Sequence, residues 1–193
     1  MIIAYTIILM IFLALLLQRD LTAISRLPFK GGWKVAFMVA GLLFLQFVLV
    51  IFAGQRTWLE MALVILSHLA VMFVALLNRH IPGAKLFALG IVLNTLVMAA
   101  NGGWMPITPA MHQYVHPDQT LAVETKPPLS KSIILSRSET RLWVLSDIIP
   151  APLPWRRYVI SLGDILLVLG AAQFIFQTTA VKETSPPDPI LQG

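Results

Sequence analysis

The sequence contains no cysteine among its 193 residues, so disulfides, thiolate metal sites and cysteine nucleophiles are excluded. It also contains few charges. Only 12% of the residues are charged and 58% are hydrophobic, whereas about a quarter of a soluble domain is charged. A single core in water cannot hide that much apolar surface, because a folded chain of this size still exposes a large area. We therefore expect an integral membrane protein.

Two further features are missing. No basic residue precedes the first apolar run, residues 1–17, and the first charges, Arg19 and Asp20, follow it. A secretory signal peptide has the opposite order, so we interpret this run as a retained helix. The sequence also lacks a phosphate-binding loop, a dinucleotide-binding glycine motif and a nucleophile elbow. We therefore expect no enzymatic activity and no cofactor.

Five apolar runs are separated by charged or Gly/Pro-rich breaks. A helix needs about 20 mostly apolar residues to cross a bilayer, and the runs lack the period-two alternation of strands. The fold class predicted is an all-α membrane protein with one polytopic domain, residues 1–178, and a polar C-terminal tail, residues 179–193. The predicted spans lie near residues 1–18, 34–54, 57–77, 84–100 and 157–178, with a long, proline-rich outer loop, residues 101–156, between the fourth and fifth.

The short connections differ in charge. The first and third are basic, whereas the second has only Arg56. Basic short loops stay in the cytoplasm, which predicts a multi-pass protein of the cell membrane with its N-terminus outside and its C-terminus cytoplasmic. The basic residues of the first and third connections are Arg19, Arg26, Lys30, Lys34, Arg79 and Lys85.

The outer loop contains two patterned stretches. Residues 130–145 could form a short helix or a hairpin. Residues 148–155 are apolar and rich in proline, which suits a segment that lies at the membrane surface.

Asp164 is the most informative polar residue of the predicted spans. It follows Arg157 by seven residues, which places it about 10 Å below the outer edge of the fifth helix. A carboxylate there is costly unless it is paired, hydrated or protonated. It could form a proton, cation or polar-ligand site, or it could tie the outer loop through backbone and asparagine hydrogen bonds. We favour the second interpretation, because the residue can reach loop amides.

Other polar residues could join Asp164. Ser161 lies one turn above it, and Asn94 and Gln46 lie at similar depth on their helices. They could form one cluster or make separate helix-packing hydrogen bonds, and the second is somewhat favoured. His68, near the middle of the third helix, has no second intramembrane histidine, which excludes bis-His haem within this chain. The candidate intramembrane polar site is Asp164, Asn94, Gln46, Ser161 and His68.

Gly83 and Gly90 lie on the same side of the fourth helix as Asn94 and Asn101. Small residues let helices approach closely, so this stripe predicts a helix–helix contact.

His112 and His116 are four residues apart and Asp118 follows them. On a helix they would share a face and could hold a metal ion. Prolines bracket the segment, however, and Gln113 follows His112 where a hydrolytic zinc helix has glutamate. We expect no metal site, with these three residues as weak candidates.

Four motifs occur in order after residue 78: residues 78–83 (NRHIPG), the run from Asn94 to residues 101–107 (NGGWMPI), residues 145–150 (LSDIIP) and residues 160–166 (ISLGDIL). On these motifs the chain resembles a bacterial family of small polytopic membrane proteins of unknown function, over roughly residues 1–178. It departs from the family pattern at Ser146, usually glycine, and at Trp104, usually arginine. The resemblance implies a membrane location and this helix arrangement, and it brings no activity.

The motifs lie on one side of the predicted topology. We expect them to form an outer cap over the fourth and fifth helices, in which Asp147 and Asp164 accept backbone N–H bonds from the glycine-rich turn. The candidate outer cap consists of Asn101, Gly102, Gly103, Trp104, Met105, Pro106, Asp147 and Pro150.

The sparse chemistry favours a non-catalytic accessory or assembly subunit of a larger membrane complex, for example a photosynthetic or respiratory one. The alternative is a membrane carrier or binding protein for a small or lipidic ligand such as a quinone. The expected partners are the lipid bilayer and other membrane proteins, with no nucleic acid.

Overall fold

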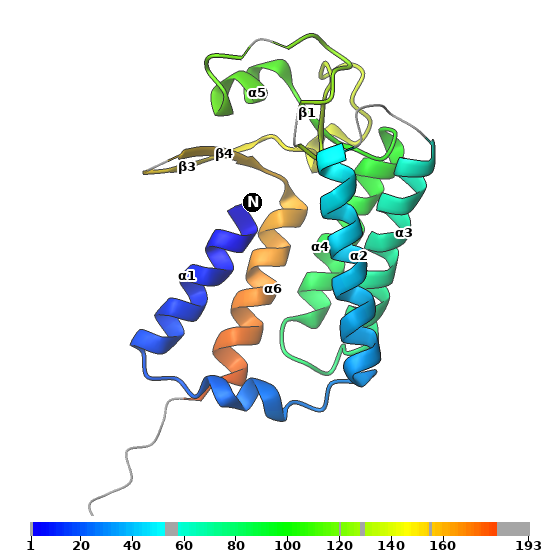
Figure 1. Cartoon of the computed structure of the whole chain (residues 1–193). Coiled ribbons are helices and arrows are strands. Elements are labelled where there is room, and N and C mark those ends of the chain that lie inside the picture. The colour runs from blue at the N-terminus through cyan, green and yellow to red at the C-terminus, as the bar shows by residue number, and fades with distance from the viewer. Residues whose placement is uncertain (1, 53–57, 120, 128–129, 155, 181–193) are drawn as a thin grey trace, which may run out of the picture.

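The computed structural model describes residues 2–52, 58–119, 121–127, 130–154 and 156–180 (Figure 1). Long helices make up most of the described chain, and shorter elements fill the segment between α4 and α6. The helical bundle consists of α1 (Ile2–Leu16), the 3-10 helix η1 (Leu21–Arg26), α2 (Gly32–Phe52), α3 (Trp58–Leu77), α4 (Ala84–Ala100) and α6 (Leu162–Thr178). The segment between α4 and α6 contains β1 (Met105–Ile107), α5 (Pro109–Val115), β2 (Ser132–Ile134), η2 (Trp143–Leu145), β3 (Ile149–Leu153) and β4 (Arg156–Ile160).

The prediction of a mostly helical protein is confirmed, but the all-α class is wrong for the outer loop. Residues 101–161, which we call the cap, contain a parallel pair, β1 with β2, and an antiparallel pair, β3 with β4. Residues 130–145 do not form a hairpin, because β2 pairs with the distant β1, and the short helix in this stretch is limited to η2. Residues 148–155 supply β3 of a hairpin, with alternating burial along the strand.

The fifth predicted span begins too early. Residues 156–160 form β4 and not the first turn of a helix, and α6 begins at Leu162. Asp164 therefore lies in the first helical turn and not two turns below the helix end. The physical reason is a capping box, in which Ser161 accepts from the backbone N–H of Asp164 and the Asp164 carboxylate accepts from the backbone N–H of Ser161.

Among the described residues, α3 is the one helix that is long and apolar enough to cross a membrane. Shorter apolar helices cover Tyr5–Leu16, Ala84–Ala100 and Leu162–Thr178. On length and composition the structure therefore supports one of the five expected spans.

The closest helix packing lies between α4 and α6, where glycines of the two helices face each other. An ideal Cβ on Gly83 would lie 2.0 Å from the carbonyl oxygen of Gly170, and one on Gly90 would lie 2.7 Å from that of Gly163. Gly83 and Gly90 are seven residues apart, as are Gly163 and Gly170. This spacing places both glycines of a pair on the same face of their helix. The predicted small-residue stripe of the fourth helix thus makes a backbone-to-backbone contact.

The cap is built directly onto the end of α4. Two consecutive glycines with positive φ, Gly102 and Gly103, turn the chain from α4 into β1. Parallel pairing places Met105 opposite Ser132 and Ile107 opposite Ile134. The fully buried Trp104 packs in a core cluster with its neighbours Ile133 and Leu135.

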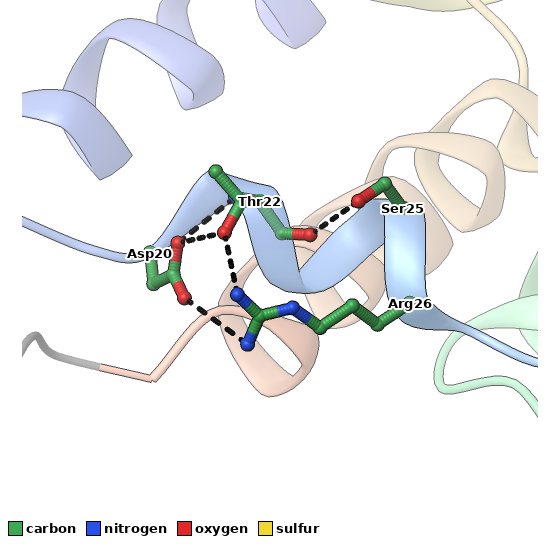
Figure 2. Close-up of polar contacts among 4 residues, drawn as sticks. All are labelled: Asp20, Thr22, Ser25 and Arg26. Carbon is green, nitrogen blue, oxygen red and sulfur yellow. Dashed lines mark hydrogen bonds and ion pairs between the residues drawn. The ribbon is translucent and has the colours of Figure 1, made fainter.

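A segment that we call the strap, residues 17–31, crosses the end of the bundle opposite the cap and contains η1 (Figure 1). Asp20 caps η1 by accepting from the backbone N–H and the hydroxyl of Thr22. Figure 2 shows the Arg26 guanidinium folded back toward Asp20, 4.0 Å from its carboxylate, while Ser25 bonds to the Thr22 carbonyl. The strap is therefore a locally ordered turn.

Both ends of the strap are attached to distant helices. Arg19 donates to the carbonyl oxygens of Phe176 and Thr179, which caps the end of α6. At the other end, the Asn78 amide accepts from the backbone N–H of Lys30 at 2.7 Å and donates to the Lys30 carbonyl at 3.2 Å. The strap thus joins the ends of α3 and α6.

Candidate functional site

Three of the predicted polar residues meet where α6 begins, and we call them the polar junction: Asn94, Ser161 and Asp164. The Asn94 amide donates to Asp164 Oδ1 at 2.9 Å and its Oδ1 accepts from the Ser161 hydroxyl at 2.9 Å. Ser161 Oγ also accepts from the Asp164 N–H at 3.0 Å, and Asp164 Oδ2 accepts from the Ser161 N–H at 3.2 Å.

The junction is closed by packing. Ser161 is fully buried and Asn94 nearly so. Gly163 makes the approach possible, because an ideal Cβ there would lie 2.1 Å from Asn94 Oδ1. The same few atoms cap α6 and tie it to α4.

The other two candidates for the intramembrane polar site are Gln46 and His68. The side chain of Gln46 on α2 lies outside the described part of the structure. His68 lies on α3, with its ring Nδ1 2.8 Å from the carbonyl oxygen of Val64 in the same helix. The Nδ1 contact of His68 is therefore within α3 and not with the junction.

The cap residues are positioned largely by main-chain hydrogen bonds. The Asn101 amide accepts from the N–H of Arg141 at 2.9 Å and donates to its carbonyl at 2.8 Å. The backbone N–H of Gly103 in the glycine-rich turn donates to the Met98 carbonyl at 2.7 Å and not to either aspartate. Asp164 accepts from Ser161, and the backbone N–H of Asp147 donates to the Pro106 carbonyl at 3.1 Å. Pro150 is exposed on β3.

Burial raises the pKa of Asp147 well above its ordinary value of 3.8, and the nearby Asp164 carboxylate raises this pKa further. Lys131 opposes the shift. Between the pKa of Asp147 in the unfolded chain and its higher pKa in the folded protein, the folded protein binds more protons than the unfolded chain. Stability therefore falls as pH rises through that window, since ionised Asp147 is costly to bury.

Replacing Asp147→Asn should raise the melting temperature relative to the wild type, and the gain should grow as pH rises through the window above pH 3.8. Thermal unfolding of the purified protein between pH 5 and pH 8 measures this. Because the variant is compared with the wild type at each pH, the effects of titrating groups that both proteins share cancel. The exposed Asp118→Asn should give a curve parallel to that of the wild type. A parallel curve for the Asp147 variant would contradict the assignment.

His112 and His116 lie on and just after the short helix α5, with ring centroids 5.1 Å apart. Burial lowers the pKa of His112, and neighbouring His116 lowers it further. Within the described ranges no group of three or more histidine, aspartate or glutamate side chains could hold a metal ion. The two rings therefore pack against each other.

Sequence patterns missed an apolar cavity of about 660 Å³ near the strap end of the bundle. Its wall is almost entirely hydrocarbon, and Asn78 is the polar residue among its lining. The lining residues come from every helix of the bundle: Ile7, Ile11, Ile24, Leu27, Phe29, Val39, Val71, Val74, Ala75, Asn78, Ile81, Pro82, Gly83, Ala84, Phe87, Gly170, Ala171, Phe174 and Ile175.

The strap forms the floor of this cavity. Ile24, Leu27 and Phe29 contribute their side chains to the lining. The same segment is held by Asn78 and by His80, whose Nε2 lies 3.0 Å from the Pro28 carbonyl oxygen. These bonds therefore hold the strap in place where it closes the cavity at the end of the bundle.

Comparisons with known proteins found one family and one relative. Residues 26–176 match a family of unknown function (DUF5317). An uncharacterized protein of Thermotoga maritima is 34% identical over 167 residues, which cover 86% of this chain and 87% of the relative. No solved structure matches the chain.

Proposed function

The chain belongs to the family of unknown function DUF5317, and from its structure we propose a multi-pass membrane protein that holds a lipidic ligand in the apolar cavity. The observation that carries the proposal is the cavity itself. Its volume of about 660 Å³ falls within the usual range of small-molecule sites. A wall of hydrocarbon with one amide selects an apolar chain.

The proposed topology has five spans, α1, α2, α3, α4 and α6, with the cap outside and the strap in the cytoplasm. Two observations support it. The strap and the α3–α4 turn lie at the same end of the bundle, opposite the cap (Figure 1). The 17 residues of α4 and of α6 extend about 26 Å each, slightly less than the hydrocarbon thickness, and the cap adds apolar residues at their outer ends.

The walls of the cavity suit a molecule that enters from the bilayer. The helix α1 packs against α6, and α2 packs against α3, so two separately supported helices border the same space. A lipid chain in the cavity would bury its hydrocarbon without desolvating charged groups, because no charged side chain lines the wall.

Filling the cavity tests the proposal. Ala75→Leu or Ala171→Leu should reduce the amount of co-purified lipid severalfold, because each adds bulk to the wall. Ala40→Leu is the matched control, since Ala40 is exposed on α2 beside the lining residue Val39. Native mass spectrometry from mild detergent measures the bound lipid, and circular dichroism verifies folding. Equal lipid occupancy in all folded variants would exclude the cavity as the site.

An accessory or assembly role in a membrane complex is the second candidate. The cap exposes large apolar side chains, with Leu142 51% and Val144 56% exposed. Exposed apolar residues close together in the sequence suit a protein contact. The same native mass spectra test this role, because a partner at fixed stoichiometry would support it and a monomer that carries only lipid would argue against it.

A further inference from the structure

The charges at the strap end are almost all positive. Asp20 is the one acidic residue in residues 17–34 and 78–85, and it is engaged with Thr22 and Arg26 (Figure 2). The basic residues of these two ranges are Arg19, Arg26, Lys30, Lys34, Arg79 and Lys85. This end of the bundle therefore has an excess of positive charge.

Several of these basic residues flank residues that line the cavity. Lys30 follows Phe29, Arg79 follows Asn78, and both neighbours belong to the wall. The backbone of Lys30 is fixed by the Asn78 amide, which brings these two chain segments together at 2.7 Å. Lys30 and Arg79 are exposed, and the structure gives neither of them a carboxylate partner among the residues it describes. Two exposed cations thus adjoin, along the chain, residues that line the apolar cavity.

Helix ends do not add to this charge. The N-terminus of α4 begins at Ala84 in the cavity wall and carries partial positive charge, but the C-terminal ends of α3 and α6 reach the same wall and carry partial negative charge. The positive charge at this end therefore comes from the basic side chains.

We propose that the ligand of the cavity is a lipid with an anionic phosphate headgroup, its chain in the cavity and its phosphate beside Lys30 and Arg79. This assignment rests on the proposed function, because it names the class of lipid that the same cavity holds. The hydrocarbon wall suits the acyl chain of such a lipid. The basic residues that adjoin the wall suit its phosphate. Inorganic phosphate has the same charged group but no chain, so it should not replace the lipid.

The test compares phosphatidylglycerol with phosphatidylcholine of identical acyl chains, added to the delipidated full-length protein in mild detergent and measured by native mass spectrometry. The wild type should prefer phosphatidylglycerol by about tenfold, since two cations each contribute severalfold near a lipid headgroup. The variant K30Q/R79Q should lose this preference and still bind phosphatidylcholine. The control K131Q/R156Q removes two exposed charges from the cap and should keep the preference.

The outcomes separate the two proposals. Equal binding of the two lipids by the wild type, or an unchanged preference in K30Q/R79Q, overturns the headgroup assignment and leaves the lipid cavity standing. A preference that survives Ala75→Leu places the anionic lipid on the protein surface and also overturns the assignment. Displacement by excess inorganic phosphate would show that the site recognises phosphate without the chain. Absence of any lipid binding by the wild type would overturn the proposed function itself.

Discussion

Gly83→Ala should lower the free energy of unfolding by about 3 kcal/mol, the largest effect expected of any single methyl group in this chain. Gly83 has φ +79°, and an ideal Cβ would lie 2.0 Å from the Gly170 carbonyl oxygen and 3.0 Å from the backbone N of Phe174. Neither neighbour is the flexible end of a side chain, so α4 and α6 would have to separate. Unfolding in SDS, followed by tryptophan fluorescence, measures the loss.

The control for this experiment is Gly41→Ala on α2. An ideal Cβ on Gly41 meets nothing within 4 Å. Alanine is favoured over glycine in a helix interior by about 0.5–1 kcal/mol, so this variant should be as stable as the wild type or slightly more stable. If the two variants unfold at the same SDS concentration, the glycine contact between α4 and α6 does not support the bundle.

Asp164→Ala should lower the free energy of unfolding by about 2–3 kcal/mol, because two donors lose their acceptor. The Asn94 amide would be left without Asp164 Oδ1, and the Ser161 N–H without Oδ2. Asp164→Asn keeps one acceptor oxygen, so its loss should be intermediate. Unfolding of both variants in SDS measures which of them loses more stability.

Asp118→Ala serves as the control, since Asp118 is exposed in the cap, and it should unfold like the wild type. Wild-type stability of both Asp164 variants would show that the junction is not a structural tie. A variant that is stable but loses lipid binding would instead connect the junction to the ligand.

The helix that was predicted best is α4, whose bounds of 84–100 match the structure. The reason is local, because the turn through Gly83 and the turn through Asn101 to Gly103 both require conformations that end a helix. The glycine stripe was predictable on the same grounds, since a seven-residue spacing fixes one face. Its partner stripe on α6, Gly163 and Gly170, has the same spacing.

The start of α6 could have been predicted and was not. The apolar residues of β4 continue the hydrophobic run into α6, which hides the boundary. The signal was Ser161 followed three residues later by Asp164, a pairing of N-cap and N3 residues that marks a helix start. By contrast, β1 pairs with β2 across more than twenty residues that include α5, and no local pattern encodes such pairing.

The cavity could not be predicted from the sequence. Its lining draws one or a few residues from each of six helices and from the turns between them, and apart from Asn78 these are ordinary apolar residues, glycine or proline. What creates the space is the arrangement of α1 and α2, which each pack against a different neighbour. The sequence showed only that basic residues are concentrated in the short connections at one end of the bundle, and this pattern predicted the membrane topology.

The attachments of the strap impose an order of assembly on the chain. The Arg19 side chain and the Asp20 N–H bond to carbonyl oxygens between Phe176 and Ala180, which are about 160 residues away. During synthesis these partners do not exist until α6 has been made, long after the strap itself. The strap therefore acquires its attachment to α6, and the cavity its complete floor, only after α6 has been synthesised.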